Sequence, residues 1–137
     1  MGAVSTLRIV AALVVLTSSA QAQGLSAETS ARLAGTYSAS CGNAKALRVQ
    51  ISADAVTVSN GGKSVVARQV QEAISYFGNA PPENYSTTVL AQVSKTATMA
   101  VVVYESGPKQ LAVQLDLDPP LLKALGTRAS DGKLPKC

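Results

Sequence analysis

The run TMAVVVY, Thr98–Tyr104, is the stretch of this sequence that decides the fold. It is dominated by β-branched, aromatic and other apolar residues, which favour extended structure. Its side chains fall into two alternating sets, and both sets are apolar. Because alternate residues of a strand point to opposite faces, both faces of this strand should be covered. We therefore predict a strand over these residues at the centre of a sheet.

Shorter alternating segments flank this central strand. Each has apolar residues at every second position, the pattern of a half-buried strand. Turns rich in Gly, Asn, Ser and Pro separate them, and Ser59–Gly62 is a strong hairpin signal. Residues 71–77 fit either a strand or a helical turn, so both alternatives stay open. The other predicted strands are Thr36–Ser40, Leu47–Ile51, Val56–Val58, Lys63–Val70, Thr87–Val93 and Leu111–Leu117.

Two short helices are predicted, one before the first strand and one after the last. Ser26 can cap a helix that runs to Ala34, and Asp118 can cap a helix that ends at Gly126. Successive strands joined by tight turns form an antiparallel meander. We therefore expect a mainly β fold: a small antiparallel meander barrel or sandwich with short N-terminal and C-terminal helices, closed by one disulfide.

The first 22 residues have the pattern of a signal peptide. Arg8 is followed by an apolar run over Ile9–Leu16 and then by the A-x-A site Ala20–Ala22. The apolar run is much shorter than the ~20 residues that a membrane-spanning helix needs. We therefore predict cleavage after Ala22, a single β-rich domain over residues 23–137, and a periplasmic or secreted location without a transmembrane segment.

Cys41 and Cys137 are the only cysteines, and both lie in the predicted domain. Two cysteines in an oxidising compartment are best interpreted as one disulfide. Two free thiols or a redox pair are the alternatives, but redox pairs usually lie close together in sequence. A bond that closes a loop of about 100 residues contributes roughly 4–5 kcal/mol in the chain-entropy model.

The composition excludes several kinds of site. The sequence has no His, which removes the commonest general base, the usual zinc ligand and Ser-His or Cys-His pairs. The formal charge is +4, but the basic residues are spread singly, which argues against nucleic acid as a partner. Asp116 and Asp118 form a D-x-D pair, in which we interpret Asp118 as a helix cap rather than a metal ligand. We expect no catalytic residue, no metal and no cofactor.

An aromatic and proline cluster stands out in a sequence with only 4% aromatic residues. Tyr76, Phe77, Pro81, Pro82 and Tyr85 lie within ten positions. Rigid aromatic rings anchor interfaces at a low entropic cost, so Tyr76 and Tyr85 are candidate binding residues. The alternative is structural: a ring fills the core, and the prolines stiffen an Ω-like loop.

The turn between the two most apolar strands is a second candidate site. It contains Ser106, Gly107, Pro108 and Lys109. Gly107 permits a positive φ, and Pro108 fixes the dihedral that follows. A turn held in this way binds with a smaller ordering cost, and Lys109 offers a cation to a partner.

The arrangement resembles the small exported inhibitors of c-type lysozyme found in Gram-negative bacteria. Over residues 36–137 the likeness is architectural: a compact β-barrel, a Cys near the first strand bonded to one at the C-terminus, and a Ser-Gly loop with a nearby Lys. It implies a Cys41–Cys137 bond and places Ser106, Gly107 and Lys109 in the lysozyme cleft. The chain departs from the family in its positive charge, since a partner of a basic lysozyme should be acidic.

From these observations we expect a non-catalytic periplasmic binding domain whose partner is a protein or an envelope component. The alternative is an inhibitor of lysozyme or of another envelope-attacking hydrolase. That inhibitor would act through the turn that contains Ser106, Gly107 and Lys109.

Overall fold

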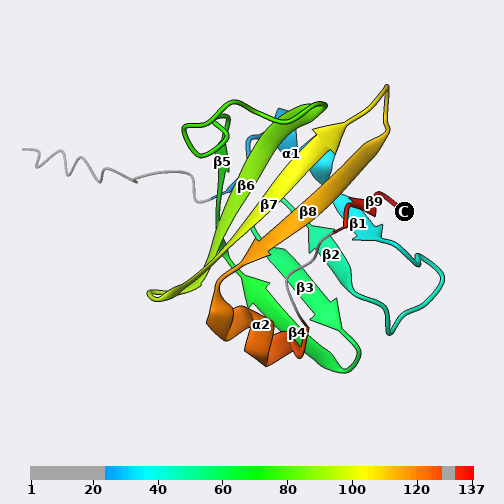
Figure 1. Ribbon diagram of the computed structural model, residues 1–137, viewed down its shortest axis with the longest axis vertical. Helices are drawn as coiled ribbons and strands as arrows, with labels where there is room; N and C mark the ends of the chain where they lie inside the picture. The colour runs from blue at the N-terminus through cyan, green and yellow to red at the C-terminus, as the bar shows by residue number, and fades with distance from the viewer. Residues whose placement is uncertain (1–23, 128–131) are drawn as a thin grey trace, which may run out of the picture.

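The computed structural model describes residues 24–127 and 132–137, and it contains two antiparallel sheets and two short helices (Figure 1). The predicted signal peptide, residues 1–22, lies outside the described residues. The expected mainly β fold with two short helices and one disulfide is confirmed, and the sheets do not form a closed barrel. Neither helix in the described part of the chain is long and apolar enough to cross a membrane.

The first sheet is a four-stranded meander in which each strand pairs with the next. Its apolar side chains alternate with polar ones, as predicted; Val56 and Val58, for example, are fully buried. Asn60 pairs with Lys63 across the hairpin predicted at Ser59–Gly62. The strands are β1 (Gly35–Ser38), β2 (Arg48–Ile51), β3 (Val56–Asn60) and β4 (Lys63–Ala67).

The second sheet has five strands, also in sequence order. Its middle strand is the one predicted from the apolar run at 98–104, and every side chain from Met99 to Tyr104 is buried. This confirms that both faces of the strand are covered. The strands are β5 (Gln69–Ala73), β6 (Tyr85–Ser94), β7 (Ala97–Glu105), β8 (Leu111–Leu117) and β9 (Leu134–Pro135).

The prediction of a single strand over Lys63–Val70 is wrong. The run is divided into β4 and β5, which belong to different sheets. Ala67 and Val70 are both buried although they are three positions apart, and a straight strand would place them on opposite faces. The exposed Arg68 between them marks the corner where the chain passes from one sheet to the other.

Both predicted helices form. α1 (Ala27–Leu33) has Ser26 at its N-cap, whose Oγ accepts a hydrogen bond from the Thr29 N–H at 3.2 Å. α2 (Pro119–Leu125) ends at Gly126, whose φ of 64° lies in the left-handed region that glycine tolerates. α2 packs against β4 and β7 and thereby bridges the two sheets.

Asp118 occupies the N-cap position of α2, but the prediction that its side chain caps the helix is wrong. Its Oδ2 instead accepts a hydrogen bond from the Thr98 N–H at 2.8 Å. The reason lies in the first helical turn: Pro119 and Pro120 have no N–H, and the Leu121 N–H already donates to the Asp118 carbonyl at 2.9 Å. The carboxylate therefore ties the start of the helix to β7.

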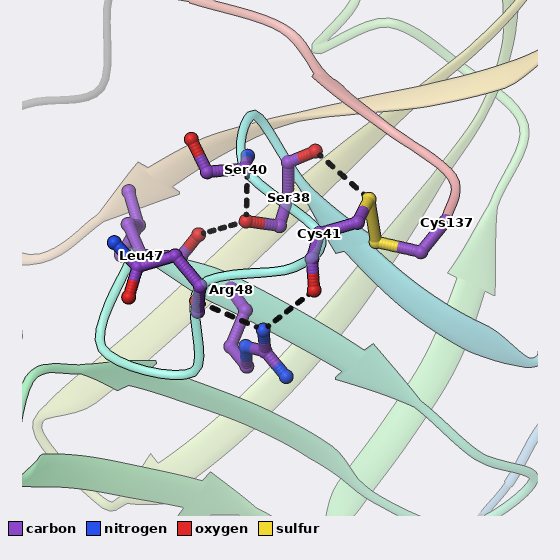
Figure 2. Close-up of a disulfide and its surroundings, with 7 residues drawn as sticks. Ser38, Ser40, Cys41, Leu47, Arg48 and Cys137 are labelled. Carbon is purple, nitrogen blue, oxygen red and sulfur yellow. Dashed lines mark hydrogen bonds between the residues drawn. A yellow bond between two sulfur atoms is a disulfide. The ribbon is translucent and has the colours of Figure 1, made fainter.

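Cys41 and Cys137 form the predicted disulfide, with Cα atoms 5.6 Å apart across a sequence separation of 96 (Figure 2). Arg48 donates to the Cys41 carbonyl at 3.3 Å, which connects the loop after β1 to β2. The buried Ser38 hydroxyl donates to the Leu47 carbonyl at 2.9 Å in the same region. The disulfide therefore joins the C-terminus to a loop that already has its own hydrogen bonds.

The C-terminal segment connects the two sheets. β9 pairs with β8 of the second sheet, while the Cys137 N–H donates to the Thr36 carbonyl at 2.8 Å and Tyr37 forms a bridge with Lys136. The sequence did not predict β9, because residues 127–137 are mostly polar and lack an alternating apolar pattern. This short strand and the disulfide hold β1 beside the second sheet.

The core lies between the two sheets, and Tyr37 is the largest of its fully buried side chains. The Tyr37 hydroxyl donates to the Leu33 carbonyl at 2.7 Å and so fixes α1 to β1. Burial raises the pKa of Tyr37 to about 12, although the positive charge of Arg32 opposes the shift. Other fully buried members are Leu33, Val49, Met99, Val101, Val103 and Leu125.

Candidate binding surface

The predicted binding residues lie at one end of the second sheet. We name residues 74–84, which connect β5 to β6, the aromatic loop, and residues 106–110, which connect β7 to β8, the hairpin turn. The Glu105 N–H donates to the Asn84 carbonyl at 2.8 Å, so the two segments meet at their bases. The fold therefore brings both predicted sites to the same end of the molecule, but their tips differ in chemistry.

The hairpin turn is closed by its own backbone. The Ser106 N–H donates to the Gln110 carbonyl at 3.1 Å, and the Gln110 N–H donates to the Gly107 carbonyl at 3.0 Å. The residue with a positive φ is Lys109, at 60°, and not Gly107 as expected. In the turn from Gly107 to Gln110, Pro108 takes the second position and Lys109 the third, and a positive φ at the third position is the feature of a type II turn.

The side chains of the hairpin turn are mostly polar and exposed. In Figure 1 the turn forms the outermost tip of the β7–β8 hairpin. Lys109 is exposed. The Ser106 hydroxyl donates to the Gln110 Oε1 at 3.4 Å, and an amide oxygen cannot take its proton as a general base would. What the turn offers is therefore a cation and a hydrogen-bonding group at an exposed tip.

Three aromatic rings hold the aromatic loop. The Tyr76 ring makes edge contacts with Phe77 at a centroid distance of 5.1 Å and with Tyr85 at 5.2 Å. The Tyr85 hydroxyl donates to the Ile74 carbonyl at 3.1 Å and lies 2.8 Å from Thr88 Oγ1. Tyr76 and Tyr85 are only partly exposed. Tyr76 and Tyr85, two of the predicted binding residues, thus stabilise the conformation of the loop through these contacts.

The side chains that the aromatic loop exposes are Ile74, which is 76% exposed, and Phe77, which is 51% exposed. Phe77 has a φ of 48°, a region that bulky residues rarely occupy. A hydrogen bond from the Asn79 N–H to the Tyr76 carbonyl at 2.7 Å closes the turn around it. Of the two alternatives for residues 71–77, the strand holds only as far as Ala73, and no helix forms there.

Sequence reasoning did not single out Ile74, and it placed Phe77 in the cluster without naming it as a site residue. The signal for Phe77 was the Gly78 and Asn79 that follow it, because both residue types mark a turn. No signal identified Ile74, since its exposure depends on where β5 ends.

Tyr104 fills the space beside the aromatic loop on the outer face of the second sheet. Only 5% of it is exposed, and its hydroxyl donates to the Gln114 Oε1 at 3.0 Å. Burial raises the pKa of Tyr104, and the neighbouring Tyr76 and Tyr85 raise it further. The Lys133 ammonium lies 4.0 Å from the centre of the Tyr104 ring. These contacts account for the burial of Tyr104 on that face.

The same end of the second sheet therefore carries exposed apolar side chains on the aromatic loop and an exposed cation on the hairpin turn. In the part of the chain that the structure describes, no three Cys, Asp or Glu side chains gather as metal ligands would. No protein-family model matches this sequence, and comparisons with curated proteins and with solved structures found no match either.

Proposed function

We propose that this protein is an exported, non-catalytic binding protein, and that another protein docks on Ile74 and Phe77. The observation that carries the proposal is that Phe77 is half exposed while its backbone is left-handed. A non-glycine residue in this conformation costs roughly 1–3 kcal/mol, and such strain clusters at binding sites. A partner that covers both side chains would remove their exposed apolar surface from water.

Export is part of the same proposal. Residues 1–22 have the three regions of a signal peptide, and a disulfide is typical of proteins in oxidising compartments such as the periplasm. A partner in the cell envelope or outside the cell follows from this location. The absence of His supports a non-catalytic role, because the commonest general base is missing.

The test is capture from an envelope extract by the immobilised mature protein. The double variant Ile74→Ser, Phe77→Ser should lose a protein that the wild type retains, while its melting temperature falls by no more than about 6 °C. Val66→Ser is the matched control, because Val66 is another large exposed apolar side chain, at 40%, on β4. If the control loses the same protein, or if the double variant keeps it, docking on the aromatic loop is wrong.

A second candidate function, inhibition of an envelope-attacking hydrolase, is favoured by the position of the hairpin turn. Lys109 is exposed there, and within the described residues no carboxylate forms an ion pair with it. Glycosidases such as lysozymes use paired carboxylates, which a cation on a narrow hairpin can approach. The mature protein should then slow the lysis of peptidoglycan by a c-type lysozyme.

Matched lysine variants test this second function. Lys109→Ala should abolish the inhibition, whereas Lys95→Ala, an exposed lysine in the turn between β6 and β7, should not. No slowing of c-type, g-type or i-type lysozymes at micromolar protein would exclude inhibition of lysozyme and leave docking on the aromatic loop intact.

A further inference from the structure

A pocket of about 540 Å³ lies where α1, the hairpin turn and the C-terminal segment meet. It is separate from the aromatic loop, because none of its lining residues belongs to residues 74–84. Volumes of this size are typical of sites for small organic ligands. Its lining residues are Ala31, Arg32, Glu105, Lys109, Leu111 and Lys136.

Positive charge dominates this pocket. Three of its side chains are cations, and Glu105 is the only anion among its described lining residues. Glu105 is already engaged, since its carboxylate lies 3.3 Å from the Arg32 guanidinium. Arg32 also donates to the Ser86 hydroxyl at 2.9 Å. Lys109 and Lys136 therefore leave about two positive charges that no carboxylate of the described chain neutralises.

The cations come from distant parts of the sequence, and side-chain contacts hold Arg32 and Lys136 in position. The Lys136 ammonium donates to the Arg32 carbonyl at 3.3 Å. The stem of Lys136 lies against Gly35, where a Cβ would come within 2.9 Å of its Cε. The closed hairpin turn sets the backbone position of Lys109, whose exposed side chain lines the pocket. Cations that are already in position lose little conformational freedom when an anion binds.

The floor of the pocket is apolar. Leu111, which is 6% exposed, and Ala31 of α1 are its apolar lining residues. The hydrocarbon stems of lysine side chains extend such apolar surface while their ammonium groups stay in water. A free inorganic anion would therefore use only the rim of this space.

We propose that this pocket binds an organic anion that has a carboxylate or phosphate group and a short hydrocarbon segment. The anionic group lies between Lys109 and Lys136, and the hydrocarbon segment contacts Leu111. Both carboxylates and phosphates accept hydrogen bonds from ammonium groups, so the shared chemistry is an oxyanion on an apolar stem. The inference goes beyond the proposed function, because it requires neither Ile74 nor Phe77.

The test is a titration of the ¹⁵N-labelled mature protein with hexyl phosphate, hexanoate and neutral hexanol at constant ionic strength. An anion should cause saturable amide shifts at Ala31, Arg32, Leu111 and Lys136 below about 10 mM. Tighter binding of hexyl phosphate would assign the natural group as a phosphate, and equal or tighter binding of hexanoate would assign it as a carboxylate. Hexanol should bind at least fivefold more weakly than the better anion.

Charge variants decide whether the pocket itself is responsible. Lys109→Gln and Lys136→Gln should each weaken binding about three- to fivefold, as expected for a partly exposed ion pair. Glu105→Gln should strengthen it, because it removes the negative charge of the pocket. Lys95→Gln is the control for net charge and should change the affinity less than twofold. Equal losses with Lys95→Gln, equal affinity for hexanol, or no saturable shifts would overturn the proposal.

Discussion

The aromatic loop and the hairpin turn lie at the same end of one sheet, but they are held in different ways. Each displays a side chain on a left-handed backbone, Phe77 with a φ of 48° and Lys109 with a φ of 60°. In the aromatic loop, the rings of Tyr76 and Tyr85 support the backbone from below. In the hairpin turn, backbone hydrogen bonds and the paired strands do so. The conformation of the aromatic loop therefore depends on side chains that a substitution can remove. The conformation of the hairpin turn depends on backbone hydrogen bonds, which a substitution leaves in place.

Loss of the disulfide should have the largest effect on stability. It should disturb the C-terminal segment beside the hairpin turn and leave the aromatic loop unchanged. Cys137→Ser should lower the free energy of unfolding by roughly 2–5 kcal/mol and the melting temperature by several degrees, because the bond closes a loop with a sequence separation of 96. Thermal unfolding with and without reductant measures the effect. Hydrogen exchange should accelerate at residues 134–137, which include Lys136 of the pocket lined by Arg32, Lys109 and Lys136 (the basic pocket), and stay unchanged in the aromatic loop.

Two outcomes would contradict this prediction. Two titratable thiols in the oxidised, denatured wild type would mean that the bond does not form. Equal acceleration of hydrogen exchange in the aromatic loop would mean that the stability of this loop depends on the C-terminal segment.

The next largest effect is a loss of folding stability at alkaline pH, which comes from deprotonation of Tyr37 beside α1. Burial raises the pKa of Tyr37 from 10.0 to about 12, so the unfolded chain loses this proton first as the pH rises. The stability that comes from the neutral hydroxyl is complete below pH 10 and falls between pH 10 and about pH 12. A shift of this size corresponds to roughly 3 kcal/mol.

Tyr37→Phe isolates that alkaline effect from the titration of the other tyrosines and the lysines. The wild type should lose roughly 3 kcal/mol more than the variant as the pH rises from 9 to above 12, measured by denaturant unfolding at each pH. The Tyr37 hydroxyl donates a hydrogen bond to the Leu33 carbonyl of α1. When this proton is lost, α1 and the basic pocket beside it should become less stable. Parallel pH profiles for the two proteins would show that Tyr37 does not titrate in this way.

A smaller effect is expected from Tyr85→Ala, which removes the support of the aromatic loop. The variant loses the ring contact with Tyr76 and the hydrogen bond to the Ile74 carbonyl, so stability should fall by about 2 kcal/mol. Phe77→Ser should change stability by less than about 1 kcal/mol, because its side chain is half exposed. Denaturant unfolding separates the two. Equal losses would mean that Phe77 is as structural as Tyr85.

The regular part of the fold could be predicted because it follows from alternation and turn chemistry. The strand at Leu111–Leu117 has the predicted bounds, and the central position of β7 follows from its two apolar faces. The prediction was wrong where tertiary structure interrupts a local pattern. Arg68 divides an alternating run at a corner between sheets, and β9 pairs with β8 in a polar tail whose end the disulfide anchors.

The candidate sites show the same limit. Tyr76, Tyr85 and the hairpin turn were recognisable by composition, whereas the exposure of Ile74 depends on the residue at which β5 ends. The basic pocket was not predictable at all, because its cations, Arg32, Lys109 and Lys136, are far apart in sequence. Only the topology places them around one pocket.

The smallest expected effect distinguishes Phe77 from Lys109, two of the three described non-glycine residues with a positive φ. Lys109→Gly should stabilise the protein by a few tenths to about 1 kcal/mol, since glycine adopts a φ of 60° without strain and the added freedom of the unfolded chain offsets only part of the gain. Lys109→Ala keeps the strain and should leave stability nearly unchanged. Phe77→Gly relieves similar strain but loses the edge contact with Tyr76, which is worth about 0.5–1.5 kcal/mol, so it should not stabilise. Denaturant unfolding of the three variants measures this. Equal stabilisation by both glycine variants would show that the Phe77 ring does not hold the aromatic loop.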